Sequence, residues 1–344
     1  MAKKMTSAEL RKYDRSDMRS ALLSFPDQFR KGLAIGRAVK LGSARANQVV
    51  VAGMGGSSFP IDIVNLHLGP LPVKLEVVRD YQIRVPLDGR SLVLVSSFSG
   101  STEETLSALD QATAAGAKVI AITAGRKLGE AAESAGCPVA RIEVDPESFQ
   151  PRFAYGYFFS IYAGILEKAN LLNLKGSGVD RLDAFLGKRI PLLDHSGRRI
   201  AEKLVGQIPL VYTSERYARS VARITKIKFN ENSKAPAFWN SFPELNHNEM
   251  QGFEFDRHRF HYLFLNDPKD DPRIHKRMAI LRRQLRKKGY PVTRYDFCGS
   301  NELERAFDGL VLGDWASYYL ALLRKKDPTP VDFIEAFKVE MKKR

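Results

Sequence analysis

The sequence lacks the features that would place the protein outside the cell or in a membrane. It contains only two cysteines in 344 residues, Cys137 and Cys298, and they form no CxxC pair. This excludes a disulfide framework and gives no zinc-binding pattern, so we expect a reducing, cytoplasmic compartment. No apolar stretch typical of a secretory signal follows the first residues, and no run reaches the roughly 18 apolar residues of a membrane helix. We therefore expect a soluble protein that does not bind membranes.

Cofactor motifs are also missing. The chain has neither the GxGxxG spacing of a dinucleotide site nor the Gly-Lys-Ser/Thr of a P-loop. It offers no convincing cluster of metal ligands, because we interpret His258 and His261, near Asp256, as flanking or occupying a strand. We expect neither a metal nor an organic cofactor.

Acidic residues are in the minority, with 39 against 54 lysines and arginines, and the net charge is +15. Such a field attracts anions, either small phosphates or nucleic acid. The most basic segment, Arg273–Lys288, contains no acidic residue, and its apolar positions recur every three or four residues, which predicts one buried helix face. It lacks interleaved aromatics and matches no nucleic-acid-binding motif, so we interpret it as a solvated surface helix and do not expect a nucleic-acid partner.

Continuous apolar runs alternate with helical segments along most of the chain. This pattern is typical of parallel strands buried on both faces, and it predicts an α/β protein with doubly wound sheets. The first series of predicted strands comprises Gln48–Ala52, Val73–Val78, Leu92–Ser97, Val119–Thr123 and Pro138–Val144. The second comprises Ile208–Thr213, Phe260–Leu265 and Pro291–Phe297.

The two series predict two domains of similar architecture. Residues 1–45 are predicted to be helical, with a break at Phe25-Pro26, residues 46–189 form the first domain, and residues 190–344 form the second. The boundary lies in the basic, polar stretch near Gly187–Arg199. Further predicted helices are Thr102–Ala115, the buried Phe153–Leu166 and a last helix from about Val331.

The first candidate binding motif, GMGGSS, follows the first strand directly. Glycines let the backbone turn sharply and approach a ligand, and the free amides of a following helix favour an anion. We expect Gly55, Gly56 and Ser57 to face the ligand. The alternative is an ordinary tight turn between a strand and a helix.

The second motif, SSFSGSTEET, follows the third strand and opens a helix. Several hydroxyls around one turn, together with free helix amides, can bind phosphate without lysine or metal. The predicted phosphate ligands are Ser97, Ser99, Ser101, Thr102 and Thr105. The alternative is a capping box, which needs only one hydroxyl.

Two further segments carry charged candidates. Arg152 begins a buried helix, where a cation opposes the helix dipole unless an anion or a salt bridge offsets it. The segment Lys228–Glu249 combines carboxylates, amides and a histidine with little periodicity, and we predict a loop that positions acid–base groups or, alternatively, a polar surface loop. Isomerisation between adjacent carbons needs a carboxylate base, and histidine suits ring opening. Spacing leaves Glu231, Glu244 and Glu249 open as the base.

Together these motifs resemble one family. GMGGSS followed by Asp62, SFSGSTEET, PRxxxGY and NENSKAPAFWNSFPELNHNE are similar to the bifunctional phosphoglucose/phosphomannose isomerases, which contain tandem sugar isomerase domains. The resemblance runs from Phe25 through Asp327-Pro-Thr-Pro330 and the helix after it. It implies an aldose–ketose isomerase that interconverts glucose 6-phosphate with fructose 6-phosphate through a cis-enediolate. The sequence does not decide whether mannose 6-phosphate is used as well.

The resemblance also assigns roles. It implies that Glu231 is the catalytic base, that His247 acts in ring opening, that Arg152 steadies the enediolate and that Lys338 lies near the ring oxygen. It further implies a homodimer whose active sites are built across the subunit interface.

The sequence departs from the family pattern in three places. Pro60-Ile61 replaces a glycine pair and is expected to stiffen a loop beside the ligand, Ser101 replaces an asparagine, and Phe153 and Tyr155 are larger than usual. Two rival hypotheses are a sugar-phosphate sensor without turnover and an isomerase of another phosphosugar. The presence of both Glu231 and His247 argues against the sensor.

Overall fold

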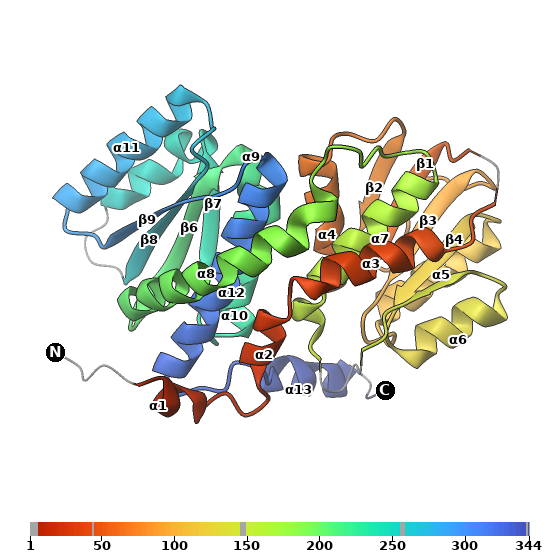
Figure 1. The fold of residues 1–344 in the computed structure, drawn as a ribbon, viewed down its shortest axis with the longest axis horizontal. Helices are drawn as coiled ribbons and strands as arrows, with labels where there is room; N and C mark the ends of the chain where they lie inside the picture. Colours follow the sequence, from red (N-terminus) through yellow and green to blue (C-terminus); the bar gives the residue numbers. More distant parts are fainter. Residues whose placement is uncertain (1–5, 43–44, 145–148, 255–258, 342, 344) are drawn as a thin grey trace. The chain divides into compact units, whose positions relative to one another are not determined.

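The computed structural model describes residues 6–42, 45–144, 149–254, 259–341 and 343. They fold as two compact units, each built on one parallel β-sheet (Figure 1). The first unit comprises Leu23–Lys188 and Asn301–Glu304, and the second comprises the residues up to Leu22, Arg189–Ser300 and the residues from Arg305 onward. The segment predicted as an N-terminal helical region, 1–45, is therefore divided between the two units.

The first unit contains a five-stranded parallel sheet, here sheet A, with the order β2-β1-β3-β4-β5. Its strands are β1 (Gln48–Gly53), β2 (Lys74–Val78), β3 (Ser91–Ser96), β4 (Lys118–Thr123) and β5 (Val139–Arg141). Between β1 and β3 the strand order reverses, so the chain leaves these neighbours toward opposite sides. Open α/β sheets bind ligands outside the carboxyl ends of strands at such a switch point, which singles out the segments after β1 and β3.

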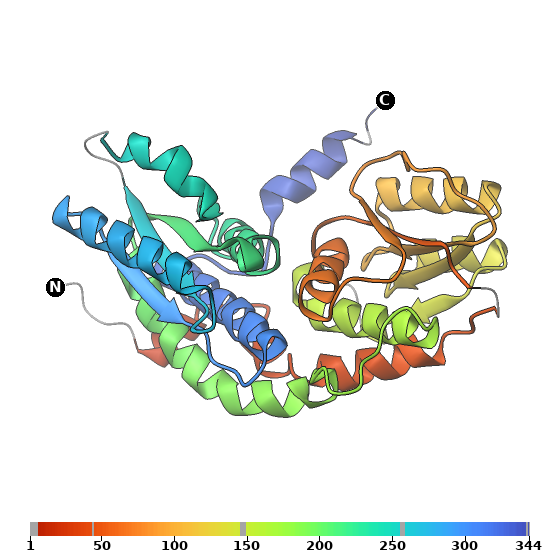
Figure 2. The ribbon, with the colours of Figure 1, turned by 90° about the horizontal axis from the view of Figure 1, so that it is seen from above.

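Helices cover both faces of sheet A (Figure 2). One face packs on α5 (Glu103–Ala114) and α6 (Arg126–Ser134), through Val50, Ala52, Val93 and Val95. Alternate residues such as Val49 and Val51 point to the other face, which is covered by α3 (Asp27–Ala38), α4 (Gly55–His67) and α7 (Tyr155–Lys168). Both sets of valines are almost fully buried, which explains why these strands are continuous apolar runs.

Glycines bring helices α3 and α7 into backbone contact. A Cβ on Gly36 would lie 2.5 Å from the carbonyl oxygen of Ile161, and one on Gly32 would lie 2.8 Å from that of Tyr157. On α7, a Cβ on Gly164 would lie 3.0 Å from the carbonyl oxygen of Leu33. Helix α3 is therefore an integral layer of the first unit.

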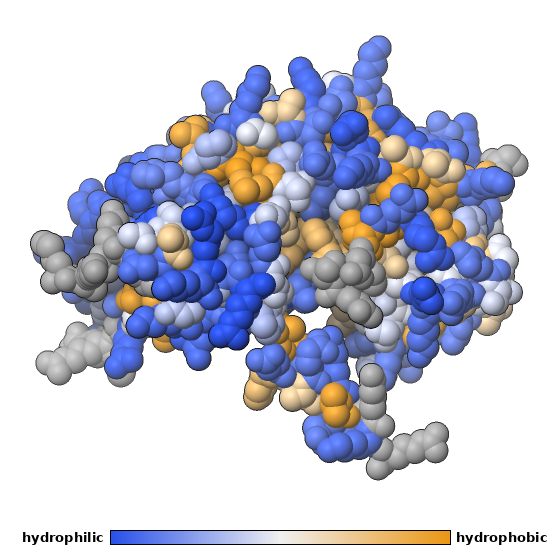
Figure 3. Space-filling view, turned by 60° about the horizontal axis from the view of Figure 1, so that its bottom comes forward, coloured by the Kyte–Doolittle hydropathy of each residue, from blue (hydrophilic) through white to orange (hydrophobic). Residues whose placement is uncertain are grey.

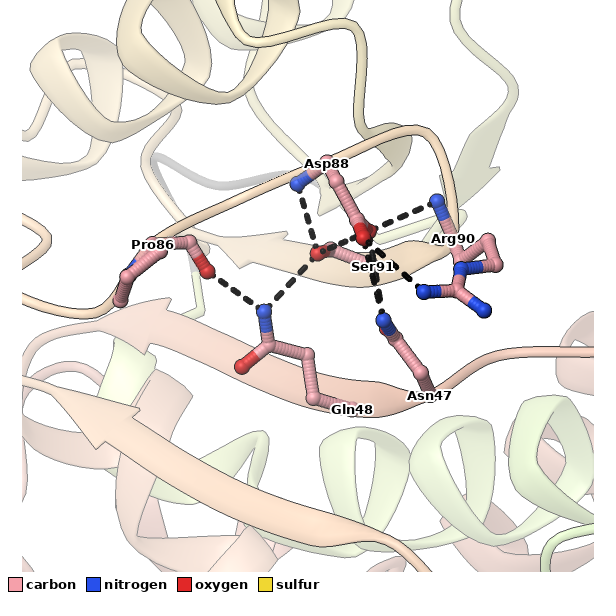
Figure 4. Close-up of polar contacts among 6 residues, drawn as sticks. All are labelled: Asn47, Gln48, Pro86, Asp88, Arg90 and Ser91. Carbon is pink, nitrogen blue, oxygen red and sulfur yellow. Dashed lines mark hydrogen bonds and ion pairs between the residues drawn. The ribbon is translucent and has the colours of Figure 1, made fainter.

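A polar network joins the amino ends of β1 and β3 (Figure 4). Gln48 Nε2 donates to Ser91 Oγ at 2.9 Å, and these two residues are also register partners. The Asp88 carboxylate accepts from the backbone N–H of Arg90 at 2.9 Å, from the Ser91 hydroxyl at 3.0 Å and from Asn47. These bonds, the Arg90 N–H foremost, lower the pKa of Asp88. The network stabilises the register in which Gly53 and Ser96 end side by side.

The second unit contains a four-stranded parallel sheet, here sheet B, in the order β7-β6-β8-β9. This is the order of the first four strands of sheet A. Its strands are β6 (Ile208–Ser214), β7 (Phe238–Phe242), β8 (Phe260–Asn266) and β9 (Val292–Asp296). On one face, the aromatic side chains of Tyr212, Phe242, Tyr262 and Phe264 pack with Met278, Leu281 and Leu285 of α11 (Pro272–Lys287).

The N-terminal helices pack on the second unit. Arg19 of α2 (Met18–Leu23) pairs with Asp194 at 2.7 Å and lies 5.1 Å from the ring centroid of Trp315. The remaining elements are α1 (Ser7–Arg11), α8 (Leu182–Leu204), α9 (Glu215–Tyr217), α10 (Arg223–Glu231), α12 (Glu302–Leu323), α13 (Asp332–Met341), the 3₁₀ turns η1 (Pro151–Phe153), η2 (Val179–Arg181), η4 (Glu244–His247) and η5 (Glu249–Glu254), and the π-helical η3 (Ala218–Ala222).

The predicted α/β class and the parallel arrangement are confirmed, as are all eight predicted strand positions and the helices at α5, α7 and α11. Strand β5 is shorter than predicted, because Val144 N–H donates to the carbonyl oxygen of Ile142 and the chain turns there. The basic stretch at Gly187–Arg199, where the domain boundary was predicted, lies inside the continuous helix α8, which contains Pro191, and the two units divide between Lys188 and Arg189. Among the described residues, no helix is both long and apolar enough to cross a membrane.

The α3–α7 contact generates a stability prediction. Gly36→Ala should lower the free energy of unfolding by about 1–3 kcal/mol, because the added methyl group meets backbone that cannot move aside. The matched control is Gly187→Ala on α8, where a Cβ would meet nothing within 4 Å. It should raise stability by about 0.5–1 kcal/mol, since alanine is the better helix former. Calorimetric melting measures both, and equal shifts in the same direction would contradict the proposed crowding.

Candidate functional site

The segment after β1 is held by close backbone contacts. Gly55 has a φ of +48°, which favours glycine, and helix α4 begins there. A Cβ on Gly56 would lie 2.7 Å from the carbonyl oxygen of Pro151, so no side chain fits there. Ser57 Oγ accepts from the backbone N–H of Phe98 at 3.0 Å. The glycine-rich segment therefore contacts both η1 and the segment after β3.

The hydroxyls after β3 cluster at the start of α5. Ser97 Oγ lies 2.8 Å from Thr102 Oγ1 and accepts from the backbone N–H of Gly100 at 3.1 Å. The exposed hydroxyls of Ser99 and Ser101 lie 3.3 Å apart. Thr102 is the N-cap residue of α5, yet its side chain makes no capping hydrogen bond. Thr102 therefore does not act as a side-chain cap, and among the described residues no capping side chain is found at this end of α5, which suits anion binding.

Thr105, one turn into α5, is buried as Ser97 is, but it differs from the other four hydroxyl residues in its hydrogen bonding. It is only 1% exposed, and its Oγ1 has no hydrogen-bond partner among the described residues. Buried hydroxyls are normally hydrogen-bonded, so an unpartnered one is available to a ligand or to an ordered water molecule.

The segment after β4 packs against the backbone of the hydroxyl cluster. A Cβ on Gly125 would lie 1.8 Å from the carbonyl oxygen of Ser99, which only glycine allows. The Gly125 N–H donates to the carbonyl oxygen of Phe98 at 3.0 Å. Sequence analysis missed Gly125, although a glycine so soon after a buried strand was an available signal.

Arg152 lies beside the glycine-rich segment. It is in η1, just before α7, and is 5% exposed. Its guanidinium carbon lies 4.8 Å from the ring centroid of Phe153, and Nη1 donates to Gln150 Oε1 at 3.3 Å. The Arg152 Cα would be 3.1 Å from a Cβ on Gly56. The first unit thus brings together the glycine-rich segment, the hydroxyl cluster and a buried cation.

Two further residues of the first unit support helix α4 and were not predicted. The Tyr162 hydroxyl donates to the carbonyl oxygen of Ser57 at 2.6 Å. Arg79 donates to Ser58 Oγ at 3.0 Å and pairs with Asp62 at 2.7 Å. The aspartate after the glycine-rich motif therefore has a structural partner.

The positions that depart from the family pattern lie in well-packed surroundings. Pro60 is buried inside helix α4, so the expectation that it stiffens a loop is wrong. Phe153 and Tyr155 are 4% and 1% exposed, and the Tyr155 ring lies 4.4 Å from that of Phe25. The bulk of both side chains is therefore accommodated in the core of the first unit.

In the second unit, Glu231 is the last residue of α10. The buried Lys228, one turn earlier, pairs with Asp314 of α12 at 2.8 Å and donates to the carbonyl oxygen of Leu310 at 3.0 Å. Burial lowers the Lys228 pKa, and Asp314 opposes this effect. Breaking a buried pair of this kind costs about 3–5 kcal/mol, so the pair holds the end of α10 firmly.

The residues after Glu231 are also attached to α12. Asn232 Nδ2 donates to Ser317 Oγ at 2.9 Å, and Ser233 Oγ donates to the carbonyl oxygen of Ser317 at 2.7 Å. The prediction of an irregular loop over Lys228–Glu249 is therefore wrong in part. The segment begins in helix α10, contains strand β7 and ends in η4 and η5. Strand β7 was missed because it is an edge strand with a mixed sequence, Phe-Trp-Asn-Ser-Phe.

The two other candidate carboxylates have local partners. Glu249 accepts hydrogen bonds from the Tyr212 hydroxyl and from Asn240, which tie η5 to sheet B. The exposed Glu244 accepts from Asn248 Nδ2 at 2.8 Å. All three bonds are ones that a structural carboxylate would make.

His247 ends the turn η4 and is exposed. The turn is anchored by the fully buried Leu245 and by Arg277 of α11, which donates to Asn246 Oδ1 at 3.2 Å. Lys338 lies on α13, where it pairs with Glu335 at 2.7 Å, and the two side chains are 59% and 58% exposed. The structure thus places Glu231, His247 and Lys338 in the second unit.

Within the described ranges, no group of three or more His, Cys, Asp or Glu side chains could hold a metal ion. Asp256 and His258 lie outside the described residues. His261 occupies β8, as predicted, and its Nε2 lies 2.8 Å from Thr293 Oγ1. Burial lowers the pKa of His261 to about 4.

Comparisons with known proteins agree with this architecture. The family model described as the bacterial phospho-glucose isomerase C-terminal SIS domain matches residues 194–341. A bifunctional phosphoglucose/phosphomannose isomerase of Caldicellulosiruptor bescii is 34% identical over 93% of this chain and 98% of its own length. A D-glucosamine-6-phosphate 4-epimerase of Sulfolobus acidocaldarius is 35% identical over 61% of this chain and 65% of its own length.

The fold is shared more widely than the sequence. The solved structure of a glucosamine-6-phosphate deaminase from Thermotoga maritima matches with a TM-score of 0.64 at 16% identity, and the match covers 94% of this chain and 97% of that one. At this identity the match shows the fold alone. The near full-length similarity to the Caldicellulosiruptor enzyme shows more: the chain belongs to the family of bifunctional phosphoglucose/phosphomannose isomerases.

Proposed function

We propose that the protein interconverts glucose 6-phosphate with fructose 6-phosphate, and mannose 6-phosphate with the same ketose. The observation that carries this proposal is the hydroxyl cluster at the start of α5, where Thr102 makes no capping hydrogen bond, in a chain of this family. The phosphate would bind Ser97, Ser99, Ser101, Thr102 and Thr105, with Gly55, Gly56 and Ser57 facing the sugar. No metal or organic cofactor is part of this mechanism.

The proton transfer is assigned to Glu231. Its carboxylate would take the proton from C2 of the opened aldose and return it to C1, through a cis-enediolate. Arg152 would lower the energy of the enediolate by electrostatic stabilisation of its oxygen. His247 and Lys338 would open and close the ring by moving a proton to and from the ring oxygen.

An aminosugar phosphate is the second candidate substrate. The Sulfolobus epimerase is as similar in identity as the Caldicellulosiruptor isomerase, although over less of the chain. Assays of glucose 6-phosphate, mannose 6-phosphate and glucosamine 6-phosphate with one preparation separate the two candidates. Turnover of glucosamine 6-phosphate alone would contradict the proposed isomerisation of glucose 6-phosphate and mannose 6-phosphate.

The proposed assembly is a cytoplasmic homodimer with shared active sites. Its support is the apolar surface of α13, where Phe333 is 91% exposed and Phe337 63% exposed (Figure 3). A monomer in water seldom exposes adjacent large apolar side chains of this kind. A second copy of the chain would cover them and would bring Lys338 into an interface.

Dimer formation can be tested on α13 directly. The double variant Phe333→Asp, Phe337→Asp should shift the protein from dimer to monomer in light scattering, because each change places a charge in an apolar interface. Leu192→Asp on α8, which also changes an exposed apolar residue, is the control and should remain dimeric. A monomeric wild type, or a double variant that stays dimeric, would contradict the assignment.

The proposed phosphate contacts can be tested by kinetics. The double variant Ser99→Ala, Thr102→Ala should raise KM for fructose 6-phosphate by about 10- to 100-fold, because it removes hydrogen bonds to a charged group. Thr113→Ala is the control, since that hydroxyl bonds to the carbonyl oxygen of Leu109 near the other end of α5. The assignment of the cluster fails if the double variant and the control have the same KM.

The base can be tested with an isosteric change. Glu231→Gln should lower kcat by about 10²–10⁴-fold, because the amide cannot accept the C2 proton. Fructose 6-phosphate should still bind, since the proposed phosphate contacts come from other residues. Exchange of the C2 proton of glucose 6-phosphate with deuterated solvent should occur in the wild type and be nearly absent in the variant.

Glu244→Gln is the matched control for this change, because Glu244 is an exposed carboxylate of the same segment. It should keep most of the turnover and the exchange. Normal exchange in Glu231→Gln would instead make Glu244 or Glu249 the next candidate for the base.

A further inference from the structure

The second unit contains a cavity that the proposed reaction does not use. It has a volume of about 340 Å³ and is lined by one face of α11 together with residues of β9 and of the end of β8. Figure 1 shows α11 beside these strands. A cavity of this size suits a small ligand. None of its lining residues belongs to the glycine-rich segment, to the hydroxyl cluster or to the segment around Glu231.

The charged side chains that line this cavity are basic. They are His275 and Arg282 of α11 and Arg294 of β9. Arg294 pairs with Asp296 at 2.6 Å. The Nε of Arg282 is buried, and it has no hydrogen-bond partner among the described residues.

The charges around Arg282 are more positive than negative. Burial lowers the pKa of Arg282, and the positive charges of Arg294 and Arg286 lower it further, while Asp296 opposes them. Two guanidinium groups placed this way repel each other unless an anion lies between them. Arg273, Lys276, Arg283 and Arg286 are exposed along the same helix and would raise the local concentration of anions.

A residue that lines the cavity also carries a buried hydrogen-bond acceptor. Asn266, the last residue of β8, is 2% exposed, and its Nδ2 donates to Asp296 Oδ1 at 3.0 Å. That bond fixes the orientation of the amide, because the opposite orientation would direct Oδ1 at a carboxylate. The Oδ1 of Asn266 then has no partner within the described part of the chain. Leaving such an atom unsatisfied is costly, so a hydroxyl donor is expected beside it.

We propose that this cavity is a second anion site, which binds a phosphate group carrying or adjoining a hydroxyl. Arg282 Nε–H donates to a phosphate oxygen, and Asn266 Oδ1 accepts from the hydroxyl. Inorganic hydrogen phosphate and a phosphorylated sugar both have this chemistry. The site makes use of the basic helix α11, whose charge the isomerase reaction does not require.

Binding of inorganic phosphate tests the proposal. The experiment uses the full chain with Ser99→Ala and Thr102→Ala, so that binding at the hydroxyl cluster is suppressed. Calorimetric titration should still detect one phosphate per chain. Adding Arg282→Gln should weaken that binding at least 10-fold, whereas adding Arg283→Gln, an equal change of charge on an exposed neighbour, should change it less than about 2-fold. Equal affinities in the two variants would overturn the site.

Two other ligands define the occupant. Sulfate carries no hydroxyl at neutral pH, so it should bind about 10-fold more weakly than phosphate, and equal binding would overturn the role of Asn266. Glucose 6-phosphate is titrated into the same variants. If glucose 6-phosphate binds more tightly than phosphate, and if Arg282→Gln abolishes that binding, the occupant is a phosphorylated sugar. If only inorganic phosphate shows this dependence, the occupant is free phosphate. Both results support the site.

Thermal unfolding separates binding from a structural role. In buffer free of phosphate and sulfate, Arg282→Gln should unfold at no lower temperature than Arg283→Gln. The reason is that Arg282→Gln removes the repulsion between Arg282 and the neighbouring arginines. Phosphate should then raise the unfolding temperature of Arg283→Gln more than that of Arg282→Gln. A lower unfolding temperature for Arg282→Gln without anion, with equal phosphate effects, would show that Arg282 is structural and would overturn the proposal.

Discussion

The site in the first unit depends on backbone segments that approach too closely for any side chain to lie between them. A Cβ would lie 2.7 Å from a carbonyl oxygen at Gly53, 2.7 Å at Gly56 and 1.8 Å at Gly125. Gly53 ends β1, Gly56 lies just after β1 and Gly125 lies just after β4, and their contacts are with Ser96, η1 and Ser99 respectively. Because these backbone segments are in direct contact, the hydroxyl cluster is held in place before any ligand binds. This preorganisation reduces the entropic cost of binding.

Sheets A and B share a strand order but differ in the chemistry at their carboxyl ends. Beyond β3 the first unit presents serine and threonine hydroxyls. Beyond β8, the corresponding strand of sheet B, the second unit has Asp267, which is fully buried, pairs with Arg305 at 2.7 Å and accepts from the Tyr217 hydroxyl. That switch point is occupied by an internal ion pair. The topology therefore supplies a location for a ligand, while the residues after each strand decide whether one binds.

The parts of the fold that could be predicted are those that local sequence determines. Parallel strands buried on both faces are continuous apolar runs, and the hydroxyls before α5 follow such a run directly. Strand β7 was missed because an edge strand needs no apolar pattern. Helix α8 was missed because it contains Pro191 and many polar residues, which are not typical of a helix interior. The partners that hold the Glu231 segment were out of reach for another reason. Ser317 lies 84 positions from Ser233 in the sequence, and no local sequence pattern predicts a contact between residues so far apart.

The packing of α2 on the second unit has a consequence for synthesis on the ribosome. Arg19 emerges early, but Asp194 follows 175 positions later and Tyr319 follows 300 positions later. The first unit, in contrast, is nearly continuous from Leu23 to Lys188. It can fold while the remainder is being made, whereas the second unit cannot be completed until almost the entire chain has left the ribosome. Until then, Arg19 of α2 lacks the partners that it has in the folded second unit.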